Sequence, residues 1–420
     1  MKIAIVCEYF YPDSSGGTPT DMSEMAQHLK QSYADIEIDV LTSRNLYRPT
    51  GVVGALLPRE DWQGVKIRRF GTPKSNRPSM ALRLLAGGVF SATVLSFLLR
   101  HRSYDVLLVV TNPPANALAA WFYKQLRGVP YVYLINDLYP DIAVALGRLE
   151  SKSLITRFFH RFQKRWLQAA ARTVVVGRCM QEYVQAQYGL PLPRIAVIRN
   201  WADPVQICPS PKANAFCQSN KLSGFVVLYG GNFSRYVNFD QILGAATLLR
   251  GNPEVTFVLI GDGVRRQEIL ERVEREKLNN VRVLPPVARS AMSGVLAASD
   301  ACLISLSPQM KGLGSPGKLY SILAAGRPVL AVVPPGSEVA RVLEEEQCGV
   351  NVADGDAEAL ARAITRLEQE AGLATRMGQN ARSALERRFT LHHAAEQFYG
   401  IFRVVLARKG RAVGPKAIGP

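Results

Sequence analysis

The chain has 420 residues, of which 48% are apolar and 20% are charged, and its formal net charge is +17. This composition excludes a disordered chain, a collagen-like repeat and a coiled coil, and the length predicts two domains. The charge is uneven, because residues 1–221 carry 27 Lys and Arg against 15 Asp and Glu, whereas residues 222–400 carry 19 of each. The positive first half favours a phosphate-rich partner, either a nucleic acid or an anionic membrane surface.

Short apolar runs alternate with helical patterns along the chain, which is typical of parallel sheets covered by helices. We therefore predict an α/β fold of two Rossmann-like, doubly wound units, over residues 1–199 and residues 223–391. Residues 200–222 are rich in Pro and Ser and are predicted to link the units. Residues 392–420 are predicted to form a helix, which could cross back to the first unit, and a basic tail. The expected strands are residues 3–6, 38–41, 106–110, 131–135, 173–176, 195–198, 225–229, 256–260, 281–284, 301–305, 329–333 and 349–352.

Residues 81–99 are mainly apolar, with Arg83 as their one charged residue, and eight Lys and Arg but no acid lie between Trp62 and Tyr104. An apolar helix in such a basic collar is typical of a monotopic protein on anionic lipid. The alternatives are a buried helix on one sheet face and a membrane-spanning helix, which the strand expected at 106–110 makes hard to build. Because Met1-Lys2 leads straight into a strand, we expect no signal peptide and a cytoplasmic protein, peripheral to the inner membrane.

Metal, redox and nucleic-acid sites are not expected. The six cysteines form no C-x-x-C pair, and the five histidines form no H-E-x-x-H motif. No known nucleic-acid-binding motif is apparent, so we expect no nucleic-acid partner.

In the first half, candidate ligand-binding residues follow the expected strands, where ligands of such sheets bind. Gly16 and Gly17 precede a helix, so their backbone N–H groups can approach a phosphate or a sugar. That loop lacks the G-x-G-x-x-G fingerprint of a dehydrogenase. Asn112 and Asp137 follow two later strands, and Asp137 could position or deprotonate an acceptor hydroxyl. Asp141 is interpreted mainly as a cap of the next helix.

In the second half, Gly230-Gly231-Asn232 follows a strand, and Arg235 can bind a phosphate with two parallel hydrogen bonds. Gly261 ends the next strand. The small residues Ser315-Pro316-Gly317 lead into Lys318 at the start of a helix, which is typical of a diphosphate cradle. The segment is not a P-loop, because Leu319 takes the place of the Ser or Thr that would bind magnesium.

These motifs, in this order, resemble the retaining glycosyltransferases of family 4, which have the GT-B architecture of two domains facing a cleft. The likeness covers nearly the whole chain and is greatest to the bacterial branch that builds colanic acid, O-antigen and other surface polysaccharides. The motifs that carry it are Tyr9-Phe10-Tyr11-Pro12 with Gly16-Gly17, Thr111-Asn112-Pro113-Pro114, Asp137-Leu138-Tyr139-Pro140-Asp141, Asn200-Trp201-Ala202-Asp203, Tyr229-Gly230-Gly231-Asn232, and Ser315-Pro316-Gly317-Lys318 with Ala324-Ala325-Gly326-Arg327-Pro328.

The resemblance implies transfer of a hexosyl or N-acetylhexosaminyl group from a UDP- or GDP-linked sugar, with retention of configuration. Arg235 and Lys318 would neutralise the leaving diphosphate in place of a metal, and Gly17 would approach it from the first domain. Backbone groups near Leu284 and Pro285 would hold the base. The implied acceptor is a free or polyprenyl-diphosphate-linked glycan, an anionic inner-membrane surface is an implied partner, and no cofactor beyond the nucleotide sugar is expected.

Two positions depart from the common family pattern, in which a pair of glutamates flanks the lysine loop. Leu313 and Ser321 stand there instead, so Ser321 occupies the place of the residue that binds ribose. Two alternatives stay open: an enzyme similar to the UDP-sugar 2-epimerases of GT-B fold, and a non-enzymatic protein that binds anionic surfaces. An epimerase needs acid and base groups around the sugar, and no such constellation is apparent.

Overall fold

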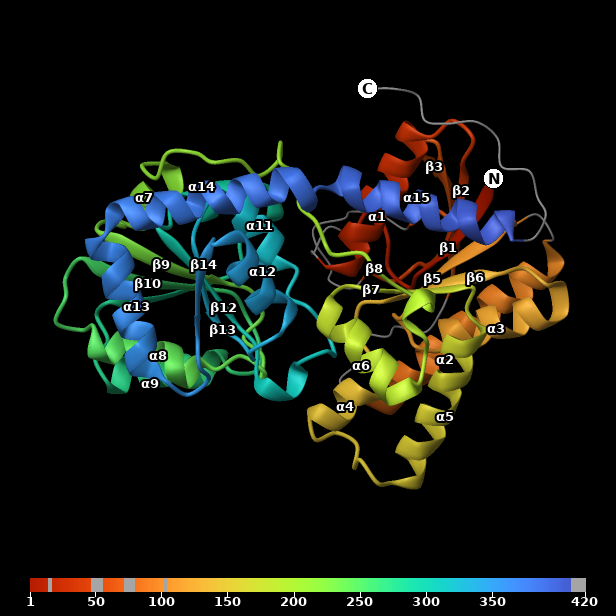
Figure 1. The fold of residues 1–420 in the computed structure, drawn as a ribbon, viewed down its shortest axis with the longest axis horizontal. Coiled ribbons are helices and arrows are strands. Elements are labelled where there is room, and N and C mark those ends of the chain that lie inside the picture. The colour runs from red at the N-terminus through yellow and green to blue at the C-terminus, as the bar shows by residue number, and fades with distance from the viewer. Residues whose placement is uncertain (14–16, 47–55, 72–79, 102–103, 409–420) are drawn as a thin grey trace. The chain divides into compact units, whose positions relative to one another are not determined.

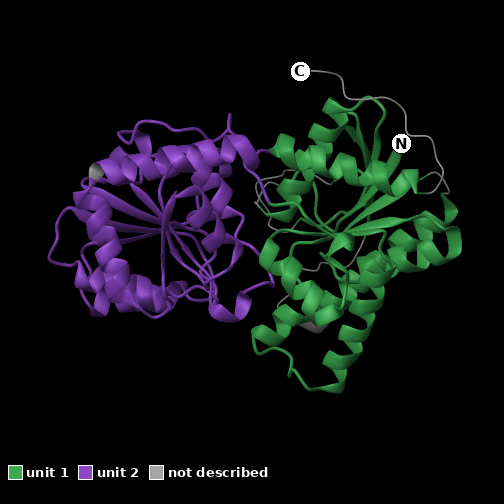
Figure 2. Ribbon diagram, in the orientation of Figure 1, with its two compact units in different colours: residues 1–199, 391–420 green, residues 200–390 purple. Residues whose placement is uncertain are grey.

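The computed structural model describes residues 1–13, 17–46, 56–71, 80–101 and 104–408. The chain forms two compact units, coloured separately in Figure 2. Unit 1 holds Met1–Arg199 and Leu391–Pro420, and unit 2 holds Asn200–Thr390. The helix α15 (Leu391–Ala407) is therefore part of unit 1, whereas the segment 200–222, expected to be a linker, is part of unit 2.

Arginine side chains attach the segment 200–222 to unit 2 through its backbone carbonyls. Arg382 donates to the carbonyls of Pro204 and Ile207, both at 3.1 Å, and Arg327 donates to that of Ser210 at 3.0 Å. The segment also contains the short helix α7 (Ala215–Ser219). Its Pro-rich pattern correctly indicated little regular structure, but it gave no sign of these contacts.

The sheet of unit 1, over the described residues, has eight strands in the order β3-β4-β2-β1-β5-β6-β7-β8. The six strands predicted in this half are all present, each within two residues at either end. Neighbouring strands run parallel except for the pair β3 and β4. The strands are β1 (Lys2–Val6), β2 (Glu37–Ser43), β3 (Arg59–Trp62), β4 (Val65–Phe70), β5 (Val106–Val110), β6 (Tyr131–Ile135), β7 (Arg172–Val175) and β8 (Ile195–Val197).

The hairpin of β3 and β4 was not predicted, because its residues do not form an apolar run. Only alternate residues of β4 are buried, and β3 has no fully buried residue. The turn consists of Gln63 and Gly64, both with positive φ (53° and 79°). Two such residues match the right-handed twist of a hairpin, so this dipeptide was the available local signal.

Helices cover both faces of the sheet of unit 1 (Figure 1). The helices α1 and α15 lie on one side, and α2, α3 and α5 lie on the other. The helices are α1 (Thr18–Ser32), α2 (Met80–Arg100), α3 (Asn116–Arg127), α4 (Asp141–Ala145), α5 (Leu154–Ala169), α6 (Arg178–Tyr188) and α15 (Leu391–Ala407), with a 3₁₀ turn η1 (Leu192–Arg194).

The helix α2 contains the segment Leu82–Arg100, which is long and apolar enough by composition to cross a membrane, and of which 33% is buried. One side of α2 packs against α3, where Ser91 Oγ donates to Asn116 Oδ1 at 2.9 Å. Leu84 and Leu85, near its start, are exposed. The helix α2 therefore has features of two of the alternatives that the sequence left open: one side is buried against the domain, and the other exposes apolar residues.

Part of the predicted basic collar faces the protein interior. Arg69 is buried, pairs with Glu60, and donates to the carbonyls of Leu57 and Tyr11 at 3.2 and 2.8 Å. Arg68 lies 3.5 Å from the carboxylate of Asp39. Neither arginine is free for lipid phosphates, so this part of the collar was misinterpreted. Lys74, Arg77 and Arg102 lie outside the described residues.

Unit 2 has a parallel sheet in the order β11-β10-β9-β12-β13-β14. All six strands predicted here are present, and helices cover both sides (Figure 1). The strands are β9 (Phe225–Gly230), β10 (Val255–Ile260), β11 (Val281–Leu284), β12 (Ala301–Ser305), β13 (Val329–Val332) and β14 (Gly349–Val352). The helices are α8 (Phe239–Leu248), α9 (Arg266–Arg275), α10 (Met292–Ala297), α11 (Lys318–Ala324), α12 (Glu338–Glu346), α13 (Ala357–Gln369) and α14 (Ala371–Arg388), with 3₁₀ turns η2 (Arg289–Ala291) and η3 (Pro308–Met310).

The terminal helix α15 is fixed to unit 1 by an aromatic pair. The rings of Tyr33, at the end of α1, and Tyr399, on α15, are stacked with centroids 3.7 Å apart. The hydroxyl of Tyr399 donates to Asp35 at 3.0 Å. Both rings are buried, so the stack and its burial stabilise the attachment of α15.

We expect Tyr399→Ala to lower the free energy of unfolding by about 2–4 kcal/mol, because it removes a buried ring and its stacking partner. Urea denaturation followed by circular dichroism measures the change. Tyr399→Phe, which keeps the stack and loses one hydrogen bond, is expected to cost about 1 kcal/mol. Equal losses in the two variants would contradict the role given to the stack.

Candidate functional site

In unit 1, the predicted residues meet at the carboxyl ends of β1, β5 and β6, which are neighbours in the sheet. Asn136 connects the loops there, because its Nδ2 donates to Thr18 Oγ1 at 3.0 Å and its backbone N donates to Thr111 Oγ1 at 3.3 Å. Asn112 accepts a hydrogen bond from the backbone N of Glu8 at 3.1 Å through its carbonyl. Hydrogen bonds thus join the ends of the three strands.

Gly17 is the N-cap of α1 and has φ +69°, a conformation that side chains rarely adopt. Among the residues that the structure describes, none would lie within 4 Å of a Cβ added at Gly17. Backbone N–H groups at such a helix start can bind an anion. Gly16, its predicted partner, lies outside the described residues.

Two aspartates of the same loop have different surroundings. Asp137 keeps contact with solvent, yet desolvation by the surrounding protein raises its pKa to about 6. Asp141 is buried, accepts a hydrogen bond from Tyr183 at 2.8 Å, and accepts another from Tyr188. Burial and the neighbouring Asp141 raise the pKa of Tyr188. Asp141 therefore joins α4 to α6 through its side chain and does not cap α4, whose N-cap is Pro140.

In unit 2, the loops after β9 and β10 touch at glycines. A Cβ added at Gly261 would lie 1.9 Å from the carbonyl oxygen of Gly231. A Cβ added at Gly263 would lie 2.5 Å from Asn232 Oδ1. Gly261 also donates its N–H to the carbonyl of Leu284 at 3.1 Å. Only glycine permits this packing, which brings the two loops and the end of β11 together.

Lys318, the first residue of α11, is half-buried beside these glycines. Its Nζ lies 3.9 Å from the ring centroid of Tyr229 and would be 2.6 Å from a Cβ at Gly231. Desolvation by burial lowers the pKa of Lys318 to about 7. Within the described residues, the buried Oγ of Ser315 has no hydrogen-bond partner. This loop therefore holds a cation and a spare hydroxyl next to glycine backbone, as a diphosphate site requires.

The other predicted cation, Arg235, is exposed. Its charge contributes to lowering the pKa of Glu268 on α9. Arg235 and Lys318 thus have different environments: the lysine lies against Tyr229, and the arginine reaches the solvent. Of the remaining predicted residues, Pro285, Gly317 and Asn232 are exposed, whereas Pro316 and Ser321 are half-buried.

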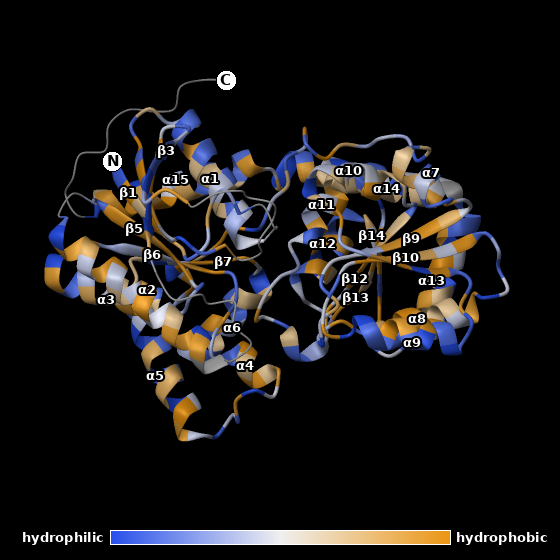
Figure 3. Ribbon diagram, turned by 180° about the vertical axis from the view of Figure 1, so that it is seen from behind, coloured by the Kyte–Doolittle hydropathy of each residue, from blue (hydrophilic) through white to orange (hydrophobic). Residues whose placement is uncertain are grey.

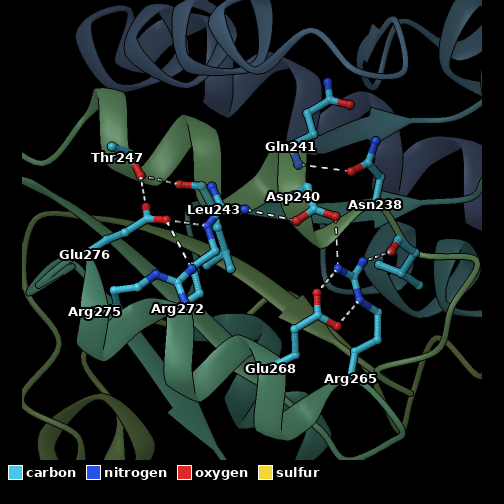
Figure 4. Close-up of polar contacts among 11 residues, drawn as sticks. Asn238, Asp240, Gln241, Leu243, Thr247, Arg265, Glu268, Arg272, Arg275 and Glu276 are labelled. Carbon is cyan, nitrogen blue, oxygen red and sulfur yellow. Dashed lines mark hydrogen bonds and ion pairs between the residues drawn. The ribbon is translucent and has the colours of Figure 1, made fainter.

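Arg265, which the sequence did not indicate, contacts the loop after β9 as well as two carboxylates. Figure 4 shows its guanidinium between Asp240 and Glu268. Its backbone N donates to the carbonyl of Phe233 at 3.1 Å, and its guanidinium donates to that of Val237 at 3.3 Å. The guanidinium also pairs with Asp240 on α8 at 2.9 Å and with Glu268. Hydrogen bonds from Arg265 hold the pKa of both carboxyls below the usual range. The i, i+3 spacing of Arg265 and Glu268 was the available signal.

No group of three or more His, Cys, Asp or Glu that could hold a metal ion occurs among the residues that the structure describes.

Known proteins match this chain over both units. The family model of the glycosyl transferase 4-like domain matches residues 16–201, and that of glycosyl transferases group 1 matches residues 213–384. The chain is 30% identical over 342 residues to the probable glycosyltransferase WbjE of Pseudomonas aeruginosa, an alignment that covers 80% of this chain and 84% of that relative. The chain belongs to glycosyltransferase family 4.

Solved structures agree on the fold. Sucrose-phosphate synthase from Thermosynechococcus elongatus superposes with a TM-score of 0.75 at 18% identity, covering 97% of this chain and all of that one. HepE of Anabaena in complex with UDP-glucose gives 0.72 at 17% identity, covering 96% of this chain and all of that one. WaaG superposes with a TM-score of 0.67 at 16% identity, covering 95% of this chain and 99% of that one. The predicted GT-B fold of this glycosyltransferase is confirmed.

We expect Gly261→Ala to destabilise the glycosyltransferase by about 2 kcal/mol or more, because the added Cβ overlaps the carbonyl of Gly231 and φ is +157°. Thermal or urea unfolding measures this. The matched control is Gly294→Ala on α10, where no described residue lies within 4 Å of the added Cβ, and it is expected to be neutral or slightly stabilising. Similar stability of the two variants would show that the loops can move apart.

Proposed function

We propose that the protein transfers a sugar from a UDP- or GDP-linked donor to a glycan acceptor in surface-polysaccharide biosynthesis, with retention of anomeric configuration. One observation carries this proposal: Lys318 lies against Tyr229 and Gly231 at the carboxyl edge of the sheet of unit 2. The names of the similar structures support it, since HepE was solved with UDP and with UDP-glucose and WaaG is involved in lipopolysaccharide biosynthesis.

In the proposed reaction, an acceptor hydroxyl forms a bond to the anomeric carbon while the bond from that carbon to the diphosphate oxygen breaks. The hydroxyl attacks on the same face from which the diphosphate leaves, so the anomeric configuration is retained. The electron pair of the broken bond stays on the diphosphate, which gains negative charge. Fixed cations stabilise charge that develops in the transition state more strongly than mobile water does. We assign this role to Lys318 and Arg235, with no metal and no further cofactor.

The proton of the acceptor hydroxyl needs a base. Asp137 stands at the carboxyl end of β6 in unit 1 and is accessible to solvent. A carboxylate with a pKa near 6 is still ionised at neutral pH and accepts a proton more readily than an ordinary carboxylate. We therefore assign the binding or deprotonation of the acceptor hydroxyl to Asp137.

We further propose that the acceptor is linked to polyprenyl diphosphate and that the enzyme works at the cytoplasmic face of the inner membrane. Two observations support this: the first half of the chain carries the excess positive charge, and the first turns of α2 expose leucines. Basic surfaces bind anionic lipid, and apolar side chains anchor a peripheral protein in it.

The direct experiment is a thermal-shift and transfer assay with a panel of UDP- and GDP-sugars, using a lipid extract as the source of acceptor. We expect one donor to raise the melting temperature and to be consumed, with the α- or β-configuration of the donor kept in the product. If no donor shifts the melting temperature and none reacts, the proposal is wrong. A donor converted to its 2-epimer without transfer would favour the epimerase alternative.

Lys318→Met is expected to weaken donor binding by about 10- to 100-fold, because the variant loses one hydrogen bond between charged groups and a bond of this kind contributes that much to affinity. Because the free lysine has a pKa near 7, it loses its proton as the pH rises, and the diphosphate binds the protonated form. Donor affinity of the unsubstituted enzyme should therefore fall from pH 7 to pH 9. Isothermal titration calorimetry across this range measures both effects.

Lys311→Met is the matched control for Lys318, because Lys311 is an exposed lysine that precedes the same loop and donates to the carbonyl of Pro335. We expect this variant to bind the donor normally and to keep the pH dependence. A pH dependence that persists in Lys318→Met would mean that another group titrates.

Asp137→Asn is expected to lower kcat by at least about 100-fold, which is the usual contribution of a general base. The rate of the unsubstituted enzyme should fall as the pH drops through 6, because the carboxylate becomes protonated, and the variant should lose this dependence. Steady-state rates between pH 5 and pH 8 measure it. Asp61→Asn, an exposed aspartate of the same unit, serves as control. If Asp137→Asn is much slower but its rate still falls below pH 6, Asp137 positions the acceptor and does not act as the base.

A further inference from the structure

The first two turns of the helix α5 have apolar residues on the outside. Leu154 is 80% exposed, Ile155 is 59% exposed and Phe158 is 58% exposed, and Phe159 is also exposed. These four residues occupy the first two turns, at the spacing that places them along one side of a helix. A surface helix of a water-soluble domain normally turns such a stripe toward the core.

The inward side of the same helix contains two buried polar residues, Thr156 and Gln163, beside the apolar Trp166 and Leu167 near its end. Thr156 Oγ1 donates to the carbonyl of Glu150 at 2.8 Å, and Gln163 Oε1 accepts from Tyr133 at 3.4 Å. His160 Nδ1 lies 3.1 Å from the hydroxyl of Tyr188. Since Thr156 and Gln163 are buried, turning the helix to hide its exposed apolar residues would break these bonds and would expose Trp166 and Leu167, which are now buried. The outward orientation of the stripe is therefore fixed.

A row of cations runs beside the apolar stripe. Arg157, Arg161 and Lys164 are exposed and recur at helical spacing on the neighbouring side of α5. The sequence from residue 151 to residue 181 contains no Asp or Glu. An apolar stripe bordered by cations matches the boundary between the acyl chains and the phosphates of an anionic bilayer.

Neighbouring helices extend this surface. Figure 3 shows α2, α3 and α5 on the same side of unit 1, and α3 contacts both of the other two. The exposed apolar residues of these two neighbours are Leu82, Leu84, Leu85 and Val89 on α2, and Phe122 and Leu126 on α3. Large exposed apolar patches on a folded protein mark an interaction surface.

We propose that α5 is the principal membrane anchor of this protein: it lies in the interface of an anionic bilayer, with Leu154, Ile155, Phe158 and Phe159 among the acyl chains. Arg157, Arg161 and Lys164 bind the lipid phosphates. The inference deepens the proposed function, because it assigns the lipid contact to named residues, but lipid binding can be measured without sugar transfer.

The position of α5 also connects the lipid surface to the acceptor loop within unit 1. His160 of α5 contacts Tyr188, which in turn donates to Asp141. Asp141 ends the loop that carries Asp137. Two successive side-chain contacts, among three residues, therefore join the lipid-facing helix to the loop assigned to the acceptor.

Sedimentation with phosphatidylglycerol vesicles, compared with phosphatidylcholine vesicles, tests the proposal on the full chain. We expect the unsubstituted protein to sediment with the anionic vesicles and to be released by high salt. Leu154→Gln with Phe158→Gln should lower the partition coefficient by at least about tenfold, because two inserted side chains are lost. Arg157→Gln, Arg161→Gln and Lys164→Gln together should remove most of the dependence on salt and on anionic lipid.

The matched control is Leu248→Gln with Arg376→Gln, an exposed leucine and an exposed arginine of unit 2, which should bind vesicles normally. Thermal melting should match among all variants, since every substituted side chain is exposed. The proposal is overturned if the α5 variants sediment like the unsubstituted protein, or if that protein does not bind anionic vesicles at all. It is also overturned if size-exclusion chromatography shows a dimer that Leu154→Gln with Phe158→Gln dissociates, since the stripe then binds a second copy.

A donor-dependent thermal shift, measured on the same preparations without lipid, separates this inference from the proposed function. Vesicle binding without any donor shift would keep the anchor and remove the transferase assignment. A donor-dependent thermal shift without vesicle binding would keep the transferase assignment and remove the anchor.

Discussion

The contact between the ends of β9 and β10 in unit 2 permits no side chain at its centre, and the arrangement of the whole candidate donor site depends on it. Gly261 approaches the carbonyl of Gly231 so closely that even a methyl group would overlap it. Lys318 reaches the face of Gly231 that a side chain would otherwise fill. The absence of a Cβ therefore creates both the backbone surface and the space in which the ammonium group lies. Arg265 fixes this arrangement by binding the carbonyls of Phe233 and Val237 on one side and Asp240 on α8 on the other.

Burial of Lys318 has a cost and a use. An ammonium group surrounded by protein and facing an aromatic ring loses hydration, which is why its pKa falls toward neutrality. The same desolvation strengthens its interaction with any anion that enters, because no water has to be removed from the cation at that moment. If Lys318 binds the diphosphate as we propose, the fold supplies this cation in advance. In unit 1, desolvation likewise raises the pKa of Asp137, because burial disfavours the charged form.

The sequence predicted every strand that forms a continuous apolar run, because a strand buried on both faces has no polar positions to hide the pattern. It missed β3 and β4, whose alternating and charged residues fit an edge hairpin as well as a loop.

Site residues at strand ends were also predictable, because the order of the strands fixes which loops lie at the carboxyl edge of the sheet. The side-chain partners were not. The sequence suggests that Arg69 is a surface cation, yet in the fold its guanidinium contacts Glu60 and two backbone carbonyls. Arg265 reads as an ordinary helix residue, yet it binds the glycine loops.

The two apolar helices of unit 1 show what composition can and cannot indicate. The helix α2 is the more apolar in sequence, so its composition predicted a membrane contact, but one side of it packs against α3. The helix α5 contains basic residues throughout and therefore looks like a solvated surface helix. Its character becomes visible only when the inward side is known, because Thr156 and Gln163 occupy the positions where core residues are expected. The first two turns of α5 bury a threonine and expose leucine, isoleucine and phenylalanine, which is the arrangement expected of a helix that also contacts an apolar environment, as we propose. The positive charge of the first half of the chain then has a physical role beside that stripe, since the same lipid surface that accepts the apolar residues supplies the phosphates that the cations bind.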